Sequence, residues 1–455
     1  MWRMIREMAR WVLVLAVFYA PWAYGCTNEA TNRGLVWLLS AALGLWGVAC
    51  LGSWRKPHVS SFIVVVSAMI LLLGWGMTLN AKNFYDVEFR DVLPLPYVLW
   101  NGGPGSYANV LSEEIMWRVT VLLGVVWMAS DLARNKAWLQ KLLAAMALAG
   151  CSIALFGLVQ KCLNIPSFFW EGKGYGPSVF ATYKNDANAG AYLNLIVPVV
   201  MGFLVLAVAR GKRHFLRTLW LVALILLLGS ALVHTSRAAT IMTGVLVLVF
   251  LAWRRNFFFW LLGRSSRLPL MSGLAAFLVA LVVVALAVGM KFSVQSWMHW
   301  EDTTNTAFGR LAAYGAWLSM VPEAGWFGFG PGTFQAAALS YAPVYPSTQA
   351  QNWWRYAHED YLQTIIEWGF VGAVLWAVLF GGAVWRGYRR LKQGNGNSLT
   401  EKTLMGCVWL ALLGVMVHSF VDFPLQIGSI QYYVALYLGV LWSNALPTRI
   451  EQAGK

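Results

Sequence analysis

Long apolar runs alternate with short polar segments along the whole chain, and this alternation is the main structural signal. The runs are about 20 residues long, the length that an α-helix needs to cross roughly 30 Å of hydrocarbon. A transmembrane β-barrel would instead show alternating segments of about 10 residues, and the sequence has none. We therefore predict an all-α polytopic membrane protein with about 12 transmembrane helices, in a single domain covering residues 1–455. The predicted spans are 11–25, 35–52, 61–80, 116–130, 142–160, 187–209, 218–234, 238–253, 268–290, 363–385, 403–421 and 427–445.

The longest interval without a predicted span is residues 291–362, between the ninth and tenth spans. It contains Arg310 before a helical pattern, a glycine-rich turn at 325–332, and His358 followed by two acids. If the N-terminus is cytoplasmic, this order of spans places both termini in the cytoplasm and the long loop on the outer side. We interpret the other spans as the scaffold that holds this loop at the bilayer.

The composition agrees with a membrane protein, because 59% of the residues are hydrophobic, 12% are charged and the mean hydropathy is +0.59. The formal net charge of +15 would also fit a nucleic-acid-binding protein, but its distribution argues against that class. Most Lys and Arg residues fall in the predicted cytoplasmic segments, and most acids fall on the other side, as the positive-inside rule expects. We therefore expect no nucleic-acid partner.

The five cysteines show no spacing typical of a metal site. Cys50, Cys151 and Cys407 fall in apolar runs, where we expect them to act as small hydrophobic residues. Cys26 and Cys162 are both predicted on the outer side, which leaves a disulfide between them open. The sequence gives no reason to expect a bound metal or a cofactor.

Ionisable side chains at membrane depth need a physical reason, because burying them is costly. In VHTSRAAT, His234 and Arg237 lie between two apolar runs that are each shorter than about 20 residues. We expect the turn joining these runs to lie below the outer surface, where a guanidinium must meet an anion or a carboxylate. Arg237 is therefore either part of a structural ion pair, a snorkelling side chain, or an anion-binding residue with His234 beside it.

A second arginine on the same side, Arg310, opens the segment GRLAAYGAWLSM, whose apolar residues recur at helical spacing. Two arginines on one side of the membrane suit a diphosphate, because guanidinium groups pair with phosphate oxygens bidentately and remain charged. Lys184 and Asn185, at the start of the sixth span, could add another phosphate contact. The alternative for these two residues is a solvated loop end.

His358 is followed by Glu359 and Asp360, and Glu367 comes seven residues after Asp360. If a helix begins here, Asp360 and Glu367 share a face. A histidine oriented by a carboxylate is the usual arrangement for a general base. The alternative is a helix N-terminus whose dipole favours acids. His418 and Asp422, at the outer end of the eleventh span, are either supporting groups or a simple helix end.

The glycine-rich segment GWFGFGPGTF is not a nucleotide-binding loop, because it lacks the Lys-Ser/Thr of a P-loop and no strand precedes it. Its Gly-Pro-Gly is more typical of a chain that folds back tightly. The tryptophans and phenylalanines of the long loop could stack on sugar faces, or they could belong to the aromatic belt of the membrane interface.

Together these residues resemble the O-antigen ligase/polymerase superfamily. The order of the motifs and the long outer loop between spans nine and ten also fit this family, although Glu359 stands where the family usually has asparagine. The matching segments are TSRAAT (235–240), FGR (308–310), GFGPGTF (328–334), AHEDYLQTIIEWGFVG (357–372) and, more loosely, YKNDANAGAYLNL (183–195).

This resemblance implies a GT-C-like membrane enzyme that transfers a glycan from undecaprenyl diphosphate at the periplasmic face of the bacterial inner membrane. It implies an inverting reaction without a metal, which agrees with the absence of a D-x-D pair from the sequence. By motif position, Arg237 and Arg310 would hold the diphosphate and stabilise its developing charge. His358 would take the proton of the acceptor hydroxyl, and Asp360 and Glu367 would orient the loop and the histidine.

Three acceptors remain open within this reading. A lipid A core sugar would make the protein an O-antigen ligase, the end of another lipid-linked glycan a polymerase, and a serine or threonine a protein O-oligosaccharyltransferase. We favour the ligase, because the arginine and histidine motifs resemble that group in order and placement. A transporter of lipid-linked glycans fits less well, since its polar groups would be spread through the spans.

Overall fold

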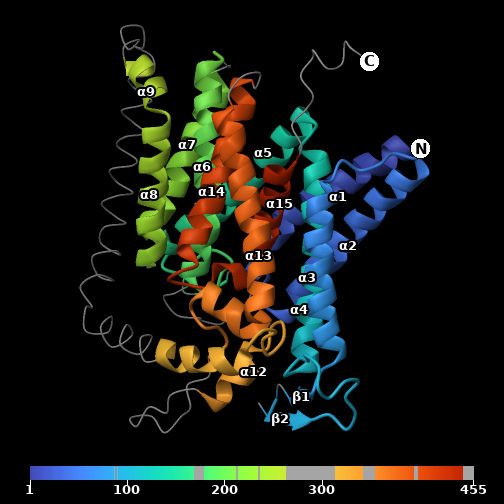
Figure 1. Ribbon diagram of the computed structural model, residues 1–455. Coiled ribbons are helices and arrows are strands. Elements are labelled where there is room, and N and C mark those ends of the chain that lie inside the picture. Colours follow the sequence, from blue (N-terminus) through green and yellow to red (C-terminus); the bar gives the residue numbers. More distant parts are fainter. Residues whose placement is uncertain are drawn as a thin grey trace.

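Long helices packed side by side form most of the protein, with shorter elements grouped at one end (Figure 1). The computed structural model describes residues 1–86, 88–89, 91–165, 167–168, 179–211, 214–233, 236–262, 313–341, 354–393 and 398–443. The long helices are α1 (Trp2–Trp22), α2 (Glu29–Gly52), α3 (Ser61–Leu79), α4 (Asn109–Leu132), α5 (Lys136–Cys162), α6 (Asp186–Ala209), α7 (His214–Val233), α8 (Arg237–Trp253), α13 (Asp360–Lys392), α14 (Leu399–His418) and α15 (Gly428–Trp442). The shorter elements are α9 (Arg255–Leu262), α12 (Phe334–Ala337), the 3-10 helices η1 (Tyr24–Cys26), η3 (Ala338–Ser340) and η4 (Pro424–Gln426), and the strands β1 (Asn83–Asp86) and β2 (Asp91–Pro94).

Eight helices of the described part are long and apolar enough to cross a membrane, namely α2, α3, α4, α5, α6, α7, α13 and α14. Helix α8 is also apolar but has only 17 residues. Helices α1 and α15 coincide with the first and last predicted spans, whereas the predicted span at 268–290 lies outside the described residues. The prediction of an all-α polytopic membrane protein is confirmed.

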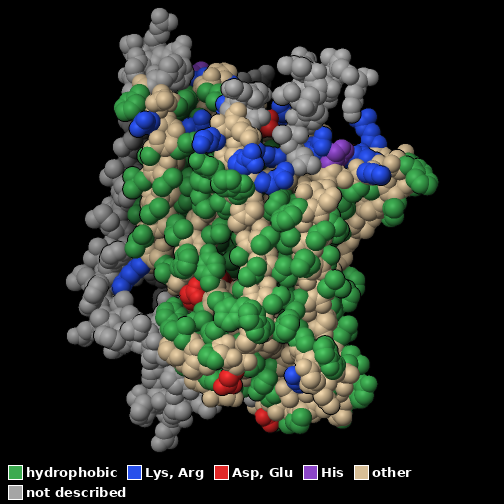
Figure 2. All heavy atoms as spheres, viewed as in Figure 1, with side chains coloured by type: hydrophobic (Ala, Val, Ile, Leu, Met, Phe, Trp, Pro, Cys, Tyr) green, Lys and Arg blue, Asp and Glu red, His purple; other side chains and the backbone are tan. Residues whose placement is uncertain are grey.

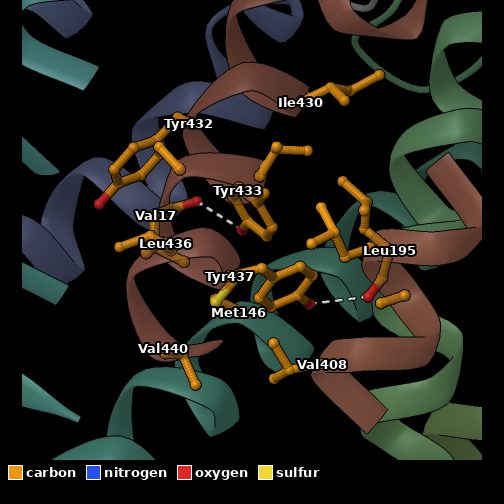
Figure 3. Packing of buried hydrophobic residues seen from close by; sticks show 14 of the residues in the cluster. Val17, Met146, Leu195, Val408, Ile430, Tyr432, Tyr433, Leu436, Tyr437 and Val440 are labelled. Atoms are coloured by element: carbon orange, nitrogen blue, oxygen red, sulfur yellow. Dashed lines mark hydrogen bonds between the residues drawn. The ribbon is translucent and has the colours of Figure 1, made fainter. Parts of the chain in front are cut away.

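Tyrosine side chains of α15 fasten this helix to its neighbours inside the bundle (Figure 3). The hydroxyl of Tyr433 donates to the Val17 carbonyl of α1 at 2.9 Å, and that of Tyr437 donates to the Leu195 carbonyl of α6 at 2.8 Å. A buried hydroxyl needs a hydrogen-bond partner, and helix carbonyls retain a free lone pair that can supply it. These contacts place α15 in the interior of the bundle.

Helix α15 also approaches α4 closely. A Cβ atom at Gly439 would lie 2.5 Å from the carbonyl oxygen of Val126, so only glycine allows the two backbones this separation. Small residues serve the same purpose at many contacts between membrane helices. The position of α15 against α4 matters below, because the two helices line a common cavity.

Basic side chains gather at one end of the bundle, where α1 begins and α6 and α13 end (Figure 2). Arg55 pairs there with the buried carboxylate of Asp131 at 3.0 Å. The face in view shows few basic side chains at the opposite end, near β1, β2 and α12. On this face, the described part of the protein has a basic end and an end poorer in positive charge.

The loop between α3 and α4 supports the glycine-rich segment. Strands β1 and β2 form an antiparallel hairpin within this loop, with Asn83 opposite Pro94. Further along, the Tyr107 amide donates to the Phe329 carbonyl at 2.6 Å, and the Ser112 hydroxyl donates to the Pro331 carbonyl at 2.7 Å. The loop thus packs on residues 328–334 instead of lying apart from them, which the sequence did not predict.

Helix α13 is broken at Gly369, whose backbone has φ 64° and ψ −174°. The break frees backbone groups that pair with the glycine-rich segment: the Val371 amide donates to the Trp326 carbonyl at 3.0 Å, and the Gly330 amide donates to the Glu367 carbonyl at 2.8 Å. A Cβ atom at Gly369 would lie 2.4 Å from the Trp326 backbone. The expected tight fold of this segment is therefore present, and it rests on the broken helix.

The cysteines of the chain are free thiols. Cys26 is buried, with its Sγ 3.5 Å from the Ala20 carbonyl oxygen, whereas Cys162 is exposed at the end of α5. The disulfide that the sequence left open is not formed.

Candidate active site

His358 lies two residues before the start of α13, at the end of the bundle opposite the basic side chains. Its Nδ1 atom is 3.6 Å from Oδ1 of Asp422, which follows the last residue of α14 by four positions. The imidazole packs edge-on against Phe423 and Trp354, with ring centroids 4.6 Å and 5.4 Å away. About a quarter of the side chain (24%) remains exposed, so a substrate can reach it.

The backbone of His358 has φ 58°, a left-handed conformation that is uncommon for residues other than glycine. Its carbonyl oxygen accepts a hydrogen bond from the Tyr314 hydroxyl at 2.9 Å. Tyr314 belongs to a helical stretch, residues 313–324, which agrees with the helical pattern predicted after Arg310. Unusual backbone conformations persist where the surroundings hold them and are frequent at functional sites. Here the long loop itself fixes the histidine backbone.

Asp422 is a mostly buried carboxylate that faces two histidines. Burial alone would raise the pKa of Asp422, but contacts with His358 and His418 and the Phe423 amide lower that pKa below its ordinary value. An ionised carboxylate beside Nδ1 favours the tautomer with its proton on Nδ1 and leaves Nε2 able to accept a proton. The arrangement can therefore act as a general base. Sequence analysis identified Asp422 only as a supporting group or part of a simple helix end.

Asp360 holds the segment that carries Asp422. Its amide donates to the Ser419 carbonyl at 3.0 Å, and its buried carboxylate accepts hydrogen bonds from the Leu425 amide and the Gln426 side chain, each at 2.9 Å. The start of α13 is thereby fastened to η4 and to the residues after α14. Asp360 is thus bonded to the segment that carries Asp422, the carboxylate beside His358.

Glu359 caps α13, because its carboxylate accepts hydrogen bonds from the amides of Tyr361 and Leu362. Burial raises the pKa of Glu359, while the two amide hydrogen bonds act in the opposite direction. For this residue the helix N-terminus interpretation is the right one. An asparagine at the same place would also be a good cap.

Glu367 fixes the glycine-rich segment from within α13. Its carboxylate accepts hydrogen bonds from the amides of Gly332 and Phe334, at 3.1 Å and 3.3 Å. Gln363, one turn earlier, donates to Glu367 at 3.0 Å and accepts the Ala357 amide at 3.0 Å. The two residues thus connect the glycine-rich segment with the residue before His358. Sequence analysis missed Gln363, although its position four residues before Glu367 on the same helix face was a usable signal.

Arg237 is the first residue of α8 and is partly buried. Helices α6 and α8 both run toward the basic end (Figure 1), and they meet where the Asn194 side chain donates to the Ala239 carbonyl at 3.0 Å. Arg237 therefore starts α8 beside the body of α6, two residues before Ala239.

The remaining predicted site residues are only partly placed. The Asn185 side chain caps α6 by accepting the Ala187 amide at 2.9 Å, and the neighbouring Lys184 is exposed. His234 and Arg310 lie outside the described residues, as do residues 291–312 and 342–353 of the predicted long loop. Their predicted roles remain predictions.

Comparison with known families identifies the central part of the chain. Residues 222–377 match the family model Wzy_C, described as O-antigen ligase. Over these residues the chain is similar to the O-antigen ligase family. The resemblance predicted from the sequence motifs is thereby confirmed, and the matched region contains Arg237, Arg310, His358, Asp360 and Glu367. No curated protein matches the chain.

The match of residues 222–377 to this family model, on a chain with several apolar helices, supports a multi-pass membrane protein and a glycosyltransferase-like enzyme. It supports glycan transfer of the O-antigen ligase/polymerase type, with a lipid-linked glycan and an acceptor as substrates. The matched region ends at residue 377, before Asp422. The contact between Asp422 and His358 is therefore a feature that the tertiary structure adds to the family match.

Proposed function

We propose that this protein transfers a glycan from undecaprenyl diphosphate to a hydroxyl of the lipid A core, as an O-antigen ligase. The observation that carries the proposal is the contact between His358 and Asp422, at the exposed end of a region that is similar to the O-antigen ligase family. A histidine with an ionised carboxylate at Nδ1 has the arrangement that activation of a hydroxyl requires. The acceptor is the most specific part of the proposal, and the order of the arginine and histidine motifs supports it.

The proposed reaction is a single displacement with inversion. The acceptor oxygen attacks the anomeric carbon while Nε2 of His358 takes the hydroxyl proton, and the bond from that carbon to the diphosphate oxygen breaks. Asp422 holds the imidazole and stabilises the imidazolium that forms. The electron pair of the broken bond remains on the lipid diphosphate, whose negative charge Arg237 and Arg310 are proposed to neutralise.

The proposed site faces the periplasm, with both termini in the cytoplasm. Support comes from the charge distribution, since Lys and Arg side chains gather at the end of the bundle opposite His358 (Figure 2). Basic residues flanking membrane spans remain on the cytoplasmic side. The proposed donor and acceptor are both lipid-anchored, which agrees with a site at the end of a helical bundle.

The test is reconstitution of the full chain in liposomes with a defined glycan on undecaprenyl diphosphate. Lipid A core, a second lipid-linked glycan and a serine-containing peptide are offered separately, and products are identified by mass. We expect transfer to lipid A core alone, unchanged by EDTA. Transfer to either other acceptor would contradict the ligase assignment, and loss with EDTA that a divalent ion restores would contradict the arginine mechanism.

The residue roles are tested in the same assay. His358→Ala, Arg237→Ala and Arg310→Ala should each abolish transfer while the protein remains folded. Matched controls are His214→Ala, an exposed histidine at the basic end, and Arg33→Ala, an arginine in a surface ion pair with Glu29. Normal transfer in the three site variants would overturn the assignment.

A further inference from the structure

An apolar cavity lies between α4, α13 and α15, away from the α8 side of the bundle. Its volume is about 420 Å³. The walls are formed by side chains such as Leu122 and Val126 of α4, Trp368 and Phe380 of α13, and Val434 and Leu438 of α15.

Small residues open the cavity along α13. Ala373, Ala377 and Gly381 line it at intervals of one helical turn, and Ala377 and Gly381 are exposed. A Cβ atom at Gly381 would meet nothing within 4 Å. The cavity is thus continuous with the outer surface of the bundle, where an apolar chain from the bilayer can enter.

A buried guanidinium lies at one end of this cavity. Arg118 of α4 is only 7% exposed and lines the cavity wall. Its Nη1 donates to the side-chain oxygen of Asn32 at 3.0 Å, and its Nε has no hydrogen-bond partner among the described residues. In the described part of the chain, no carboxylate oxygen lies within 4.0 Å of the guanidinium nitrogens of Arg118. Burying a charged group with only one neutral hydrogen-bond partner is costly in free energy unless an anion pairs with it.

The two acids at the same end of the cavity already have other donors. Glu367 accepts hydrogen bonds from the amides of Gly332 and Phe334 and from Gln363. Asp360 accepts from the Leu425 amide and the Gln426 side chain. Neither carboxylate forms an ion pair with Arg118, so the guanidinium remains available to an anion from outside.

We propose that this cavity is a lipid-binding site, in which a membrane lipid with a phosphorylated head group places its phosphoryl oxygens on Arg118 and an apolar chain between α4, α13 and α15. Charge complementarity selects the head group, because guanidinium groups pair well with phosphate oxygens. The apolar walls select a lipid over a free anion. The cavity helices differ from α8, which begins at Arg237 and packs mainly against α6, α7 and α14.

The experiment uses the full chain in phosphatidylcholine liposomes that contain a trace of phosphatidylglycerol with a photoreactive acyl chain. After irradiation, labelled peptides are mapped by mass spectrometry. We expect labelling of α4, α13 and α15 residues that line the cavity, and a loss of about tenfold or more in Arg118→Gln, because a hydrogen bond to a charged group is removed. Arg118→Lys should retain part of the labelling, and Arg33→Gln, in an exposed ion pair, should retain all of it.

A second variant keeps the proposal testable if Arg118→Gln does not fold. Gly381→Leu adds a side chain into free space at the cavity wall. It should block the space for the apolar lipid chain, with a similar loss of labelling. Unchanged labelling in folded Arg118→Gln or in Gly381→Leu would overturn the proposal. Displacement of the photoreactive lipid by millimolar inorganic phosphate would also overturn it, because it would show a site for free anions. Glycan transfer is not part of the readout, so this result is independent of the proposed function.

Discussion

The Nδ1 atom of His358 lies 3.6 Å from Oδ1 of Asp422. His358 lies just before the start of α13, and Asp422 lies just after the end of α14. Asp360 holds the two segments together through hydrogen bonds to Ser419, Leu425 and Gln426. The orientation of the imidazole therefore depends on the packing of α13 against α14 and not on residues adjacent to the histidine in sequence.

Asp422→Asn should lower the kcat of glycan transfer by about 10²- to 10⁴-fold, the usual contribution of general acid–base catalysis. An amide at this position neither stabilises an imidazolium nor fixes the proton on Nδ1. The KM for the donor should change little, because Asp422 is not assigned to donor binding. Steady-state kinetics in liposomes measure both constants, and a kcat equal to that of the wild type would contradict the role of Asp422.

The pH dependence of stability should reveal the same carboxylate. Because the pKa of Asp422 is below its ordinary value of about 3.9 in the folded protein, its contribution to stability is complete above that value. It is lost as the pH falls through the lower, folded-state pKa. The difference in Tm between wild type and Asp422→Asn should therefore be constant from about pH 8 to pH 5 and shrink below about pH 4. Thermal unfolding in detergent measures it; a difference that shrinks near neutral pH would contradict the lowered pKa.

Gly369→Ala should destabilise the protein by about 1–3 kcal/mol, because its φ of 64° with ψ −174° is a conformation almost restricted to glycine. The added Cβ would also meet the Trp326 backbone at 2.4 Å. Gly76→Ala is the matched control, since a Cβ there meets nothing within 4 Å. Thermal unfolding of both variants checks the prediction, which fails if the two have the same Tm.

Glu367→Gln should loosen the glycine-rich segment, with a loss of about 1–3 kcal/mol from the amides that it binds. A glutamine oxygen can accept a hydrogen bond, but its NH₂ group would face the second amide donor. Hydrogen exchange at Gly332 and Phe334 should become faster, whereas the exposed Glu113→Gln should leave their exchange unchanged. Equal exchange rates in Glu367→Gln and wild type would show that the carboxylate does not hold this segment.

Some of the site could be predicted because helical periodicity is a local property. Asp360 and Glu367 were expected on one face of a helix, and both are buried on α13. What each carboxylate binds was not predictable, because Gln426 and Gly332 come from distant parts of the chain. Gln363 was missed for a similar reason, because its hydrogen bonds to Ala357 and Glu367 can be recognised only in the folded chain.

The all-α membrane class, the approximate limits of most spans and the motifs that resemble the O-antigen ligase family could all be recognised from local sequence. Each span needs a local run of apolar residues to satisfy its backbone in hydrocarbon, so this information is contiguous in the chain. Three features become visible only in the folded chain: Asp422 faces His358, the glycine-rich segment rests on the break at Gly369, and Arg118 lies buried beside an apolar cavity. These features depend on which helices touch and at what depth, and side-chain packing between helices sets both.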